Sequence, residues 1–266
     1  MRSVEVAALR ASACVMGVLP DHLGQFRVAQ RWWWRRRPGH RILPQRLADG
    51  TRLELDLGDR TQALTYLTRR YCDELIAQIV GRLPDAGLLF DVGANAGLVT
   101  FQVAHRRPDA RIVAFEPNPA AVAAWLRNRR LSPSRSVTLE ATAVGDRLGS
   151  VNLDAPATDL GAGLVAPSGR GVEVPTTTLD AYCASRGIDR IDVVKVDVEG
   201  FEPEVLRGAR ELLAAGAIRS LIVELNDGHF ARRGGSRRAI VEWLGDHRMV
   251  PCGPLDADDV TFAPAG

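Results

Sequence analysis

The sequence feature that most constrains the fold is a glycine-containing loop between a predicted strand and a predicted helix, in the stretch LLFDVGANAG at residues 88–97. The apolar residues 88–90 predict a strand that is buried on both faces of a sheet. Gly93 and Gly97 allow the backbone to turn tightly after Asp91, and a helical pattern follows. Backbone N–H groups at the start of that helix can bind an electronegative group of a ligand. An ordinary tight turn would show the same pattern.

A second predicted strand, residues 111–116, connects this loop with a function. It ends in Glu116, which lies nineteen residues after Gly97. In nucleotide-binding sheets, a carboxylate at about this distance accepts hydrogen bonds from ribose hydroxyls. The loop and the acid together therefore predict a nucleoside-binding site. The alternative is that Glu116 only caps the turn made by residues 117–119.

Strands and helices alternate from the first of these strands onward, which predicts parallel strands joined by helical crossovers. The fold class is therefore α/β, with a doubly wound, mostly parallel sheet of seven strands. Ligands of such sheets bind beyond the carboxyl ends of the strands, so Asp91, Glu116, residues 143–146, Asp197 and Glu224 should converge there. The predicted strands are 88–92, 111–116, 136–143, 191–197, 219–225, 248–252 and 259–263, and the predicted helices are 97–106, 119–130, 202–215 and 235–246.

Three segments outside this alternation have their own patterns. Asp49-Gly50 is a strong turn signal, and the alternation after it predicts a hairpin over 41–57. One helix is expected over 61–83, where the apolar residues fall on one side. The glycine-rich insertion at 149–178 is either a β-hairpin flap near the site or a solvated decoration.

The length of 266 residues allows one large α/β domain, predicted at 61–266, after a helical and hairpin extension at 1–60. A hydrophobic content of 46% with 25% charged residues is ordinary for a soluble protein. The net charge of +2 gives no strong global attraction to nucleic acid or membrane. Free thiols far apart in the chain suggest a reducing, cytoplasmic environment. These thiols belong to Cys14, Cys72, Cys183 and Cys252.

Residues 31–37 combine three tryptophans with four arginines. Such a segment suits a membrane interface, an anionic carrier or stacked bases. We favour the alternative that the tryptophans pack on the main domain while the arginines stay in water. The apolar segment 4–19 is a poor signal peptide because Arg10 interrupts it, and a helix packed on the main domain is expected instead. The sequence contains no run of about 18 apolar residues, so no transmembrane helix is predicted.

A second distinctive motif, DVVKVDVEG at 192–200, predicts a strand that ends in acidic residues and a glycine. Lys195, the only lysine of the chain, is expected to pair with a nearby acid. Taken together, the motifs resemble the signature blocks of FkbM-type methyltransferases over about residues 85–252. The blocks are DVGANAG at 91–97, AFEPNP at 114–119, VKVDVEGFE at 194–202, VLRGA at 205–209 and IVEL at 222–225.

This resemblance implies a class I, Rossmann-like methyltransferase fold with strand order 3-2-1-4-5-7-6 and an antiparallel seventh strand. It implies S-adenosylmethionine as methyl donor and, usually, O-methylation of a hydroxyl on a small molecule, natural product or glycan. By this likeness the first loop borders the methionine part, Glu116 holds the ribose, and the backbone of residues 143–144 borders the adenine. The implied cofactor-binding residues are Asp91, Gly93, Ala94, Asn95, Gly97, Glu116, Pro117, Asn118, Ala143 and Val144.

An alcohol acceptor needs a base that takes its proton. Asp197, at the end of the fourth core strand, is the first candidate, with Glu199 as support. His229 is the alternative base, because imidazole titrates near neutral pH. Alternatively, Asp197 is a cap at the start of the following helix or a partner of Lys195, and His229 is a solvated loop residue. No metal is expected, although oxygen ligands that suit Mg²⁺ occur on Asp197, Glu224, Asn226 and Asp227.

Two other classes of function compete with this interpretation. A nicotinamide-dependent oxidoreductase would use a related sheet, but the loop lacks a full G-x-G-x-x-G and no Tyr-x-x-x-Lys pair follows. A non-catalytic cofactor-binding or scaffold protein would keep the fold alone, and the intact Asp91, Glu116 and Asp197 argue against it. The absence of an N-P-P-Y-like block argues against nucleic acid as the methyl acceptor. The sequence does not predict an oligomeric state.

Overall fold

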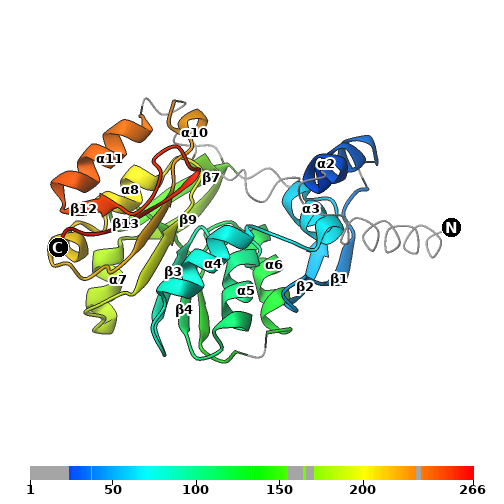
Figure 1. Cartoon of the computed structure of the whole chain (residues 1–266), viewed down its shortest axis with the longest axis horizontal. Coiled ribbons are helices and arrows are strands. Elements are labelled where there is room, and N and C mark those ends of the chain that lie inside the picture. The colour runs from blue at the N-terminus through cyan, green and yellow to red at the C-terminus, as the bar shows by residue number, and fades with distance from the viewer. Residues whose placement is uncertain (1–23, 37, 133, 155–163, 166–170, 232–234) are drawn as a thin grey trace.

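The computed structural model describes residues 24–266 except residues 37, 133, 155–163, 166–170 and 232–234. A seven-stranded sheet forms its centre, with helices on both faces (Figure 1). In spatial order the strands are β12 (Met249–Pro251), β13 (Asp259–Pro264), β11 (Leu221–Glu224), β10 (Val193–Val196), β3 (Leu88–Val92), β4 (Arg111–Phe115) and β5 (Val137–Glu140).

The order of these strands confirms the predicted α/β class and the arrangement 3-2-1-4-5-7-6. Strand β13 pairs antiparallel with both β11 and β12, and the other neighbours pair in parallel. Parallel neighbours need crossover connections, which explains the helices between them. The helices that follow the core strands are α5 (Leu98–Arg106), α6 (Pro119–Arg129), α7 (Leu179–Arg186), α8 (Glu202–Arg207), α9 (Arg210–Ala214) and α11 (Arg237–Asp246).

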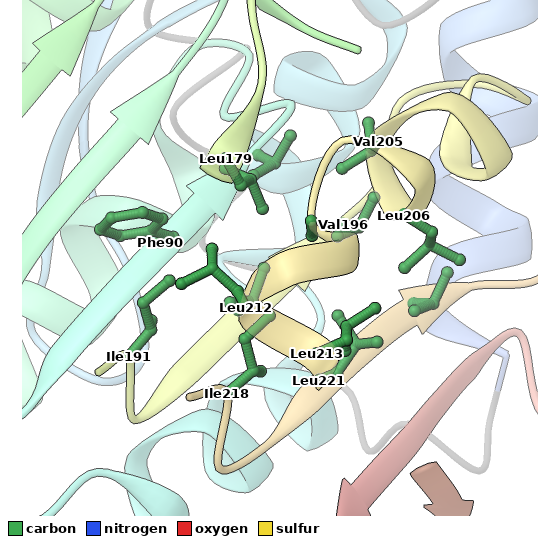
Figure 2. Packing of buried hydrophobic residues seen from close by; sticks show 14 of the residues in the cluster. Phe90, Leu179, Ile191, Val196, Val205, Leu206, Leu212, Leu213, Ile218 and Leu221 are labelled. Carbon is green, nitrogen blue, oxygen red and sulfur yellow. The ribbon is translucent and has the colours of Figure 1, made fainter. Parts of the chain in front are cut away.

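The sheet separates two hydrophobic clusters, because successive residues of a strand point to opposite faces. In β3, Leu89 belongs to one cluster and Phe90 to the other. All five residues of β3 are buried, as a strand covered on both faces requires. Figure 2 shows the second cluster, where Phe90 and Leu221 of the sheet lie near Leu179 of α7 and Leu206 of α8.

The N-terminal elements up to α3 gather at one end of the molecule, far from α11, whereas α4 lies beside α5 near the sheet (Figure 1). A hairpin spans most of the predicted 41–57 segment and confirms that prediction. Leu53 and Leu55 of its second strand lie in the same buried cluster as Leu89 of the sheet. The backbone N–H of Glu54 donates to Asn128 Oδ1 of α6 at 2.7 Å. The elements are α2 (Gln25–Arg36), β1 (Ile42–Arg46), β2 (Arg52–Asp56), α3 (Arg60–Thr68) and α4 (Asp73–Arg82).

The tryptophan and arginine segment lies in α2. Trp32 and Trp33 pack partly buried against the core, and Trp33 Nε1 donates to the carbonyl of Leu57 at 3.1 Å. The expectation that the tryptophans pack on the domain is therefore right for these two and wrong for Trp34, which is 50% exposed. The helix expected over 4–19 lies outside the described residues. Among the helices of the described part, none is long and apolar enough to cross a membrane.

The predicted single helix over 61–83 is wrong, because α3 and α4 are separate helices. Arg69 closes α3 with a left-handed backbone (φ 59°), and Cys72 precedes α4 with φ 44°. The Thr68 hydroxyl donates to the carbonyl of Leu64, so it uses a local backbone partner at the helix end. The apolar periodicity continues across the break and therefore did not reveal it.

Other element boundaries also differ from the prediction. The helix expected over 202–215 is two helices, broken at Gly208, where an added Cβ would lie 1.9 Å from the carbonyl oxygen of Gly145. The strand expected over 136–143 ends at Glu140, and β6 (Ala143–Val144) joins a different sheet. The turn expected at 226–228 leads into a short helix, α10 (Asp227–Ala231). Helix α7 was not predicted.

The insertion forms a small sheet with the order β6-β9-β7-β8. Strands β7 (Gly149–Asp154) and β9 (Val172–Thr177) pair antiparallel, which confirms the short strands expected there. Strand β8 (Leu164–Val165) completes the sheet, and the rest of the segment between β7 and β9 lies outside the described residues up to Gly171. Leu153 of β7 is buried at the edge of the cleft described next.

Candidate functional site

A cleft lies where the carboxyl ends of β3, β4 and β10 meet, the place where doubly wound sheets bind ligands. Its volume is about 1010 Å³, part of which is open to solvent. The cleft brings together ten of the residues predicted for the site. They are Gly93, Ala94, Asn95, Glu116, Pro117, Asn118, Ala143, Val144, Asp197 and Glu199.

The loop after β3 has the tight turns that its glycines predict. Gly93 has φ 78°, and an added Cβ would lie 1.8 Å from the carbonyl oxygen of Asp197. A side chain at Gly93 is therefore excluded by the neighbouring loop itself. Asn95 also has a positive φ, 49°, and its Oδ1 accepts from the N–H of the next residue. Gly97 does not line the cleft, because the space beside it is filled by Phe101 and Trp125.

Glu116 follows β4 and is buried in the wall of the cleft. Its Oε2 accepts from the N–H of Asn95 and its Oε1 from the N–H of Asn118, both at 2.8 Å. Burial raises the pKa of Glu116 to about 7, although these two N–H groups act in the opposite direction. The carboxyl group therefore connects the first loop to the second and titrates near neutral pH.

Asp91 does not reach the cleft and serves a buried charge network instead. Its Oδ2 accepts from the hydroxyl of Thr100 at 2.5 Å, and its Oδ1 lies 3.2 Å from Lys195 Nζ. Lys195 Nζ also donates to the carbonyl of Gly93 at 3.0 Å and lies 3.4 Å from Asp197 Oδ2. Burial lowers the pKa of Lys195, but the charges of Asp197 and Asp91 outweigh it and raise the pKa above its usual value. The predicted pairing of Lys195 with an acid is confirmed.

The catalytic candidates lie near one another beyond β10 and β11. Asp197 and Glu199 line the cleft. His229 does not line it; its Nε2 is 3.2 Å from Glu199 Oε2 and its Nδ1 is 3.8 Å from Glu224 Oε2. Burial, and then the charges of Asp197 and Glu199, raise the pKa of Glu224 well above its usual value. His229 thus lies behind Glu199, which lines the cleft.

The loop after β10 is held by the buried side chain of Glu202. Glu202 Oε1 accepts from the N–H groups of Val198 and Gly200 at 3.0 and 3.2 Å. Glu199 has φ 56° and Gly200 has φ 97°. A left-handed backbone is costly for a residue such as glutamate, and the bonds to Glu202 hold the loop in this shape. The motif thus contains both a structural cap and cleft-lining acids.

Several cleft residues were missed by the sequence analysis. Thr61 and Tyr71 come from α3 and from the connection between α3 and α4, which the motifs do not cover. Burial raises the pKa of Tyr71 well above its usual value, so this side chain stays neutral. No local signal identified either residue, because their position depends on how the N-terminal elements pack. The other missed residues include Leu98, Val99, Phe115, Thr142, Leu153, Val198 and Phe201.

The oxygen ligands considered for Mg²⁺ do not form a metal site in the described structure. Among the described residues, no group of three or more histidine, cysteine, aspartate or glutamate side chains is arranged to hold a metal ion. The backbone N–H of Gly228 instead donates to Asn226 Oδ1 at 3.0 Å, which is a local turn contact.

Comparison with known families identifies a domain that covers this site. The family model described as "Methyltransferase FkbM domain" matches residues 91–250, which is more than half of the chain. The match begins at the end of β3 and includes the first loop, Glu116, the loop after β10 and His229.

Two curated relatives and one solved structure illustrate the similarity. The "2-O-methyltransferase NoeI" of Sinorhizobium fredii is 29% identical over 193 residues, which are 65% of this chain and 77% of that protein. The "Hexuronic acid methyltransferase AglP" of Haloferax volcanii is 28% identical over 156 residues, 58% of this chain and 62% of that protein. The precorrin-6y C5,15-methyltransferase of Geobacter metallireducens is 17% identical with a TM-score of 0.41, over 71% of this chain and 88% of that one.

Proposed function

Because this chain belongs to the FkbM methyltransferase family and is therefore an S-adenosylmethionine-dependent methyltransferase, we propose that it methylates a hydroxyl of a small molecule, natural product or glycan. One observation carries the proposal: the carboxylates of Asp197 and Glu199 lie in the same cleft as the buried carboxyl of Glu116. The names of the relatives NoeI and AglP, which specify 2-O-methylation and a hexuronic acid, support an oxygen acceptor on a sugar. Membership of this family favours a methyltransferase over the oxidoreductase and scaffold alternatives.

The cleft suits the nucleoside end of S-adenosylmethionine. Each carboxylate oxygen has about two acceptor sites, and each oxygen of Glu116 uses one of them for a backbone N–H. Glu116 can therefore still accept hydrogen bonds from two ribose hydroxyls. We assign the backbone of residues 93–95 to the methionine part and that of residues 143–144 to the adenine, because both line the cleft with Glu116.

The proposed chemistry assigns separate tasks to the protein. S-adenosylmethionine supplies a methyl group on a positively charged sulfur. The cleft holds the acceptor oxygen in line with that methyl group and excludes water, which contributes most of the rate. Asp197 takes the proton of the acceptor hydroxyl, with Glu199 beside it. Lys195 fixes Asp197 from the buried side through the 3.4 Å contact.

The acceptor can be found by comparing a deletion strain with its parent. An extract of the deletion strain should contain the unmethylated compound, which the purified protein converts when methyl-labelled S-adenosylmethionine is added. Mass spectrometry should find one labelled product, and its methyl carbon should have the chemical shift of a methoxy group. A product labelled on nitrogen or carbon would contradict the proposed O-methylation while leaving the family unchanged.

Cofactor binding should depend on Glu116 in both strength and pH. Glu116→Gln should weaken S-adenosylmethionine binding by about 1.5–3 kcal/mol, because charge-assisted bonds to the ribose become neutral. Since the pKa of Glu116 is raised to about 7 and binding favours the carboxylate, the wild-type dissociation constant should fall as pH rises from about 6 to 8. Isothermal titration calorimetry measures both effects. Wild-type affinity in the folded variant, or an equal pH dependence in the variant, would refute the ribose assignment.

A further inference from the structure

The outward face of α2 is unusual in its charge. The helix carries Arg27, Arg31, Arg35 and Arg36 and no acidic residue. The whole chain has a net charge of only +2, so without these four arginines it would be negative. All four side chains are exposed. Within the described part of the chain, no ion pair of these arginines is recorded, although arginines elsewhere in the fold form several.

Apolar side chains lie between these arginines. Phe26 is 56% exposed, Val28 46% and Trp34 50%. Helical spacing of three and four places Arg27, Arg31 and Trp34 on one side of α2. We define the outer face of α2 as Arg27, Val28, Arg31, Trp34 and Arg35, with Phe26 at its border.

The opposite side of α2 holds the helix on the protein. Gln25 and Ala29 are buried, and Gln25 Nε2 donates to the carbonyl of Thr68 in α3 at 3.2 Å. Trp33 Nε1 donates to the carbonyl of Leu57 beyond the hairpin. These contacts hold α2, which is about 18 Å long, on the protein. The apolar residues of the outer face therefore point away from the domain although the helix is well anchored.

We propose that the outer face of α2 binds the surface of a bilayer that contains anionic phospholipids. Arginines attract lipid phosphates, and tryptophan and other apolar side chains enter the boundary between headgroups and acyl chains. A nucleic acid would also attract the arginines, but it offers no apolar phase to Val28 and Phe26. The alternation of cationic and apolar groups on one side of α2 therefore favours a membrane surface. The contact is peripheral, and it is independent of the proposed methyl acceptor.

Vesicle sedimentation of the full chain tests this proposal. We expect binding to vesicles of phosphatidylcholine mixed with phosphatidylglycerol, weaker binding to phosphatidylcholine alone, and a decrease as salt is raised. The variant Arg27→Gln/Arg31→Gln/Arg35→Gln should lower the partition coefficient on the mixed vesicles by about 100-fold, since each arginine near an anionic surface contributes about fivefold. The variant Trp34→Ser, with its charge unchanged, should lower the partition coefficient by about tenfold.

A matched control removes the same charge elsewhere. Arg111, Arg130 and Arg135 are exposed and lie outside α2, so changing all three to glutamine should alter vesicle binding little. An equal loss in this control would show that net charge alone drives binding and would overturn the assignment to α2. Two results together would overturn the membrane proposal in favour of nucleic acid. They are tight, salt-sensitive binding of a single-stranded oligonucleotide, and vesicle binding that Trp34→Ser leaves unchanged. Circular dichroism melting confirms that each variant is folded.

Discussion

Asp197→Asn is expected to lower methyl transfer by about 100- to 10,000-fold, the range for a positioned general base, while the protein stays folded. Asparagine keeps the shape of the side chain and its place in the cleft but cannot accept the proton of the acceptor. Asp197 is suited to the role because it lines the cleft and is held at 3.4 Å by Lys195. The formation of S-adenosylhomocysteine with the acceptor from the deletion extract measures the rate, and calorimetry measures cofactor binding separately.

Two further variants identify the base if the assignment to Asp197 is incorrect. Glu199→Gln removes the same charge from the same cleft and is the matched control. His229→Ala removes the imidazole that lies behind Glu199 at 3.2 Å. If Asp197→Asn keeps near-normal turnover and either control loses it, the base is Glu199 or His229 accordingly. If all three variants keep it, positioning of the acceptor oxygen alone accounts for the rate.

Lys195→Met is expected to lower the free energy of unfolding by about 3–5 kcal/mol, because it leaves a buried charge without its partner. Asp91 is fully buried, and Lys195 Nζ lies 3.2 Å from its Oδ1. Methionine preserves most of the volume of the lysine side chain, so the loss reports on charge and not on packing. Denaturant unfolding gives the free energy, provided that the denaturant slope is unchanged.

The double variant Asp91→Asn/Lys195→Met is the control for that experiment. Replacing both members of a buried pair is often close to neutral, since no fully buried charge is left alone. Asp197 also loses Lys195 in this variant, but its side chain is 33% exposed and can be solvated. We therefore expect the double variant to recover most of the stability that Lys195→Met loses. Two results would contradict a stabilising Asp91–Lys195 pair. They are a single variant with the unfolding free energy of the wild type, or a double variant that is no more stable than the single variant.

The sheet could be predicted from the sequence because its strands are buried on both faces. Such strands are short, nearly continuous apolar runs, and their alternation with helices implies parallel order. The boundaries that failed depend on single backbone contacts. The breaks at Arg69 and Gly208 follow from a left-handed cap and from close approach to the Gly145 carbonyl, and neither alters the apolar pattern. Helix α7 follows the glycine-rich insertion, whose sequence pattern predicts only short strands.

The cleft was predictable to the extent that its residues lie in local motifs. Loops that follow adjacent parallel strands must meet at one edge of the sheet, so Glu116 and Asp197 could be placed together. The assignments of Asp91 and Gly97 to the cofactor stay predictions, although the structure places both outside the cleft wall. Tyr71 could not be found, because it belongs to a connection far from the motifs along the chain. Tertiary packing alone brings that connection to the cleft.

The position of Lys195 has a practical consequence for following the folding of this protein. It is the only lysine of the chain, its exposure is 2%, and it lies in β10 between β3 and β11. Only 3% of its side chain is exposed, so an amine-reactive label reaches its Nζ when the strands or the loops at this end of the sheet open. The modified fraction of one peptide, read by mass spectrometry, therefore reports openings at the centre of the sheet and its cleft, and does not report fraying at the sheet edges. The chain thus carries its own single-site reporter of opening in this part of the fold.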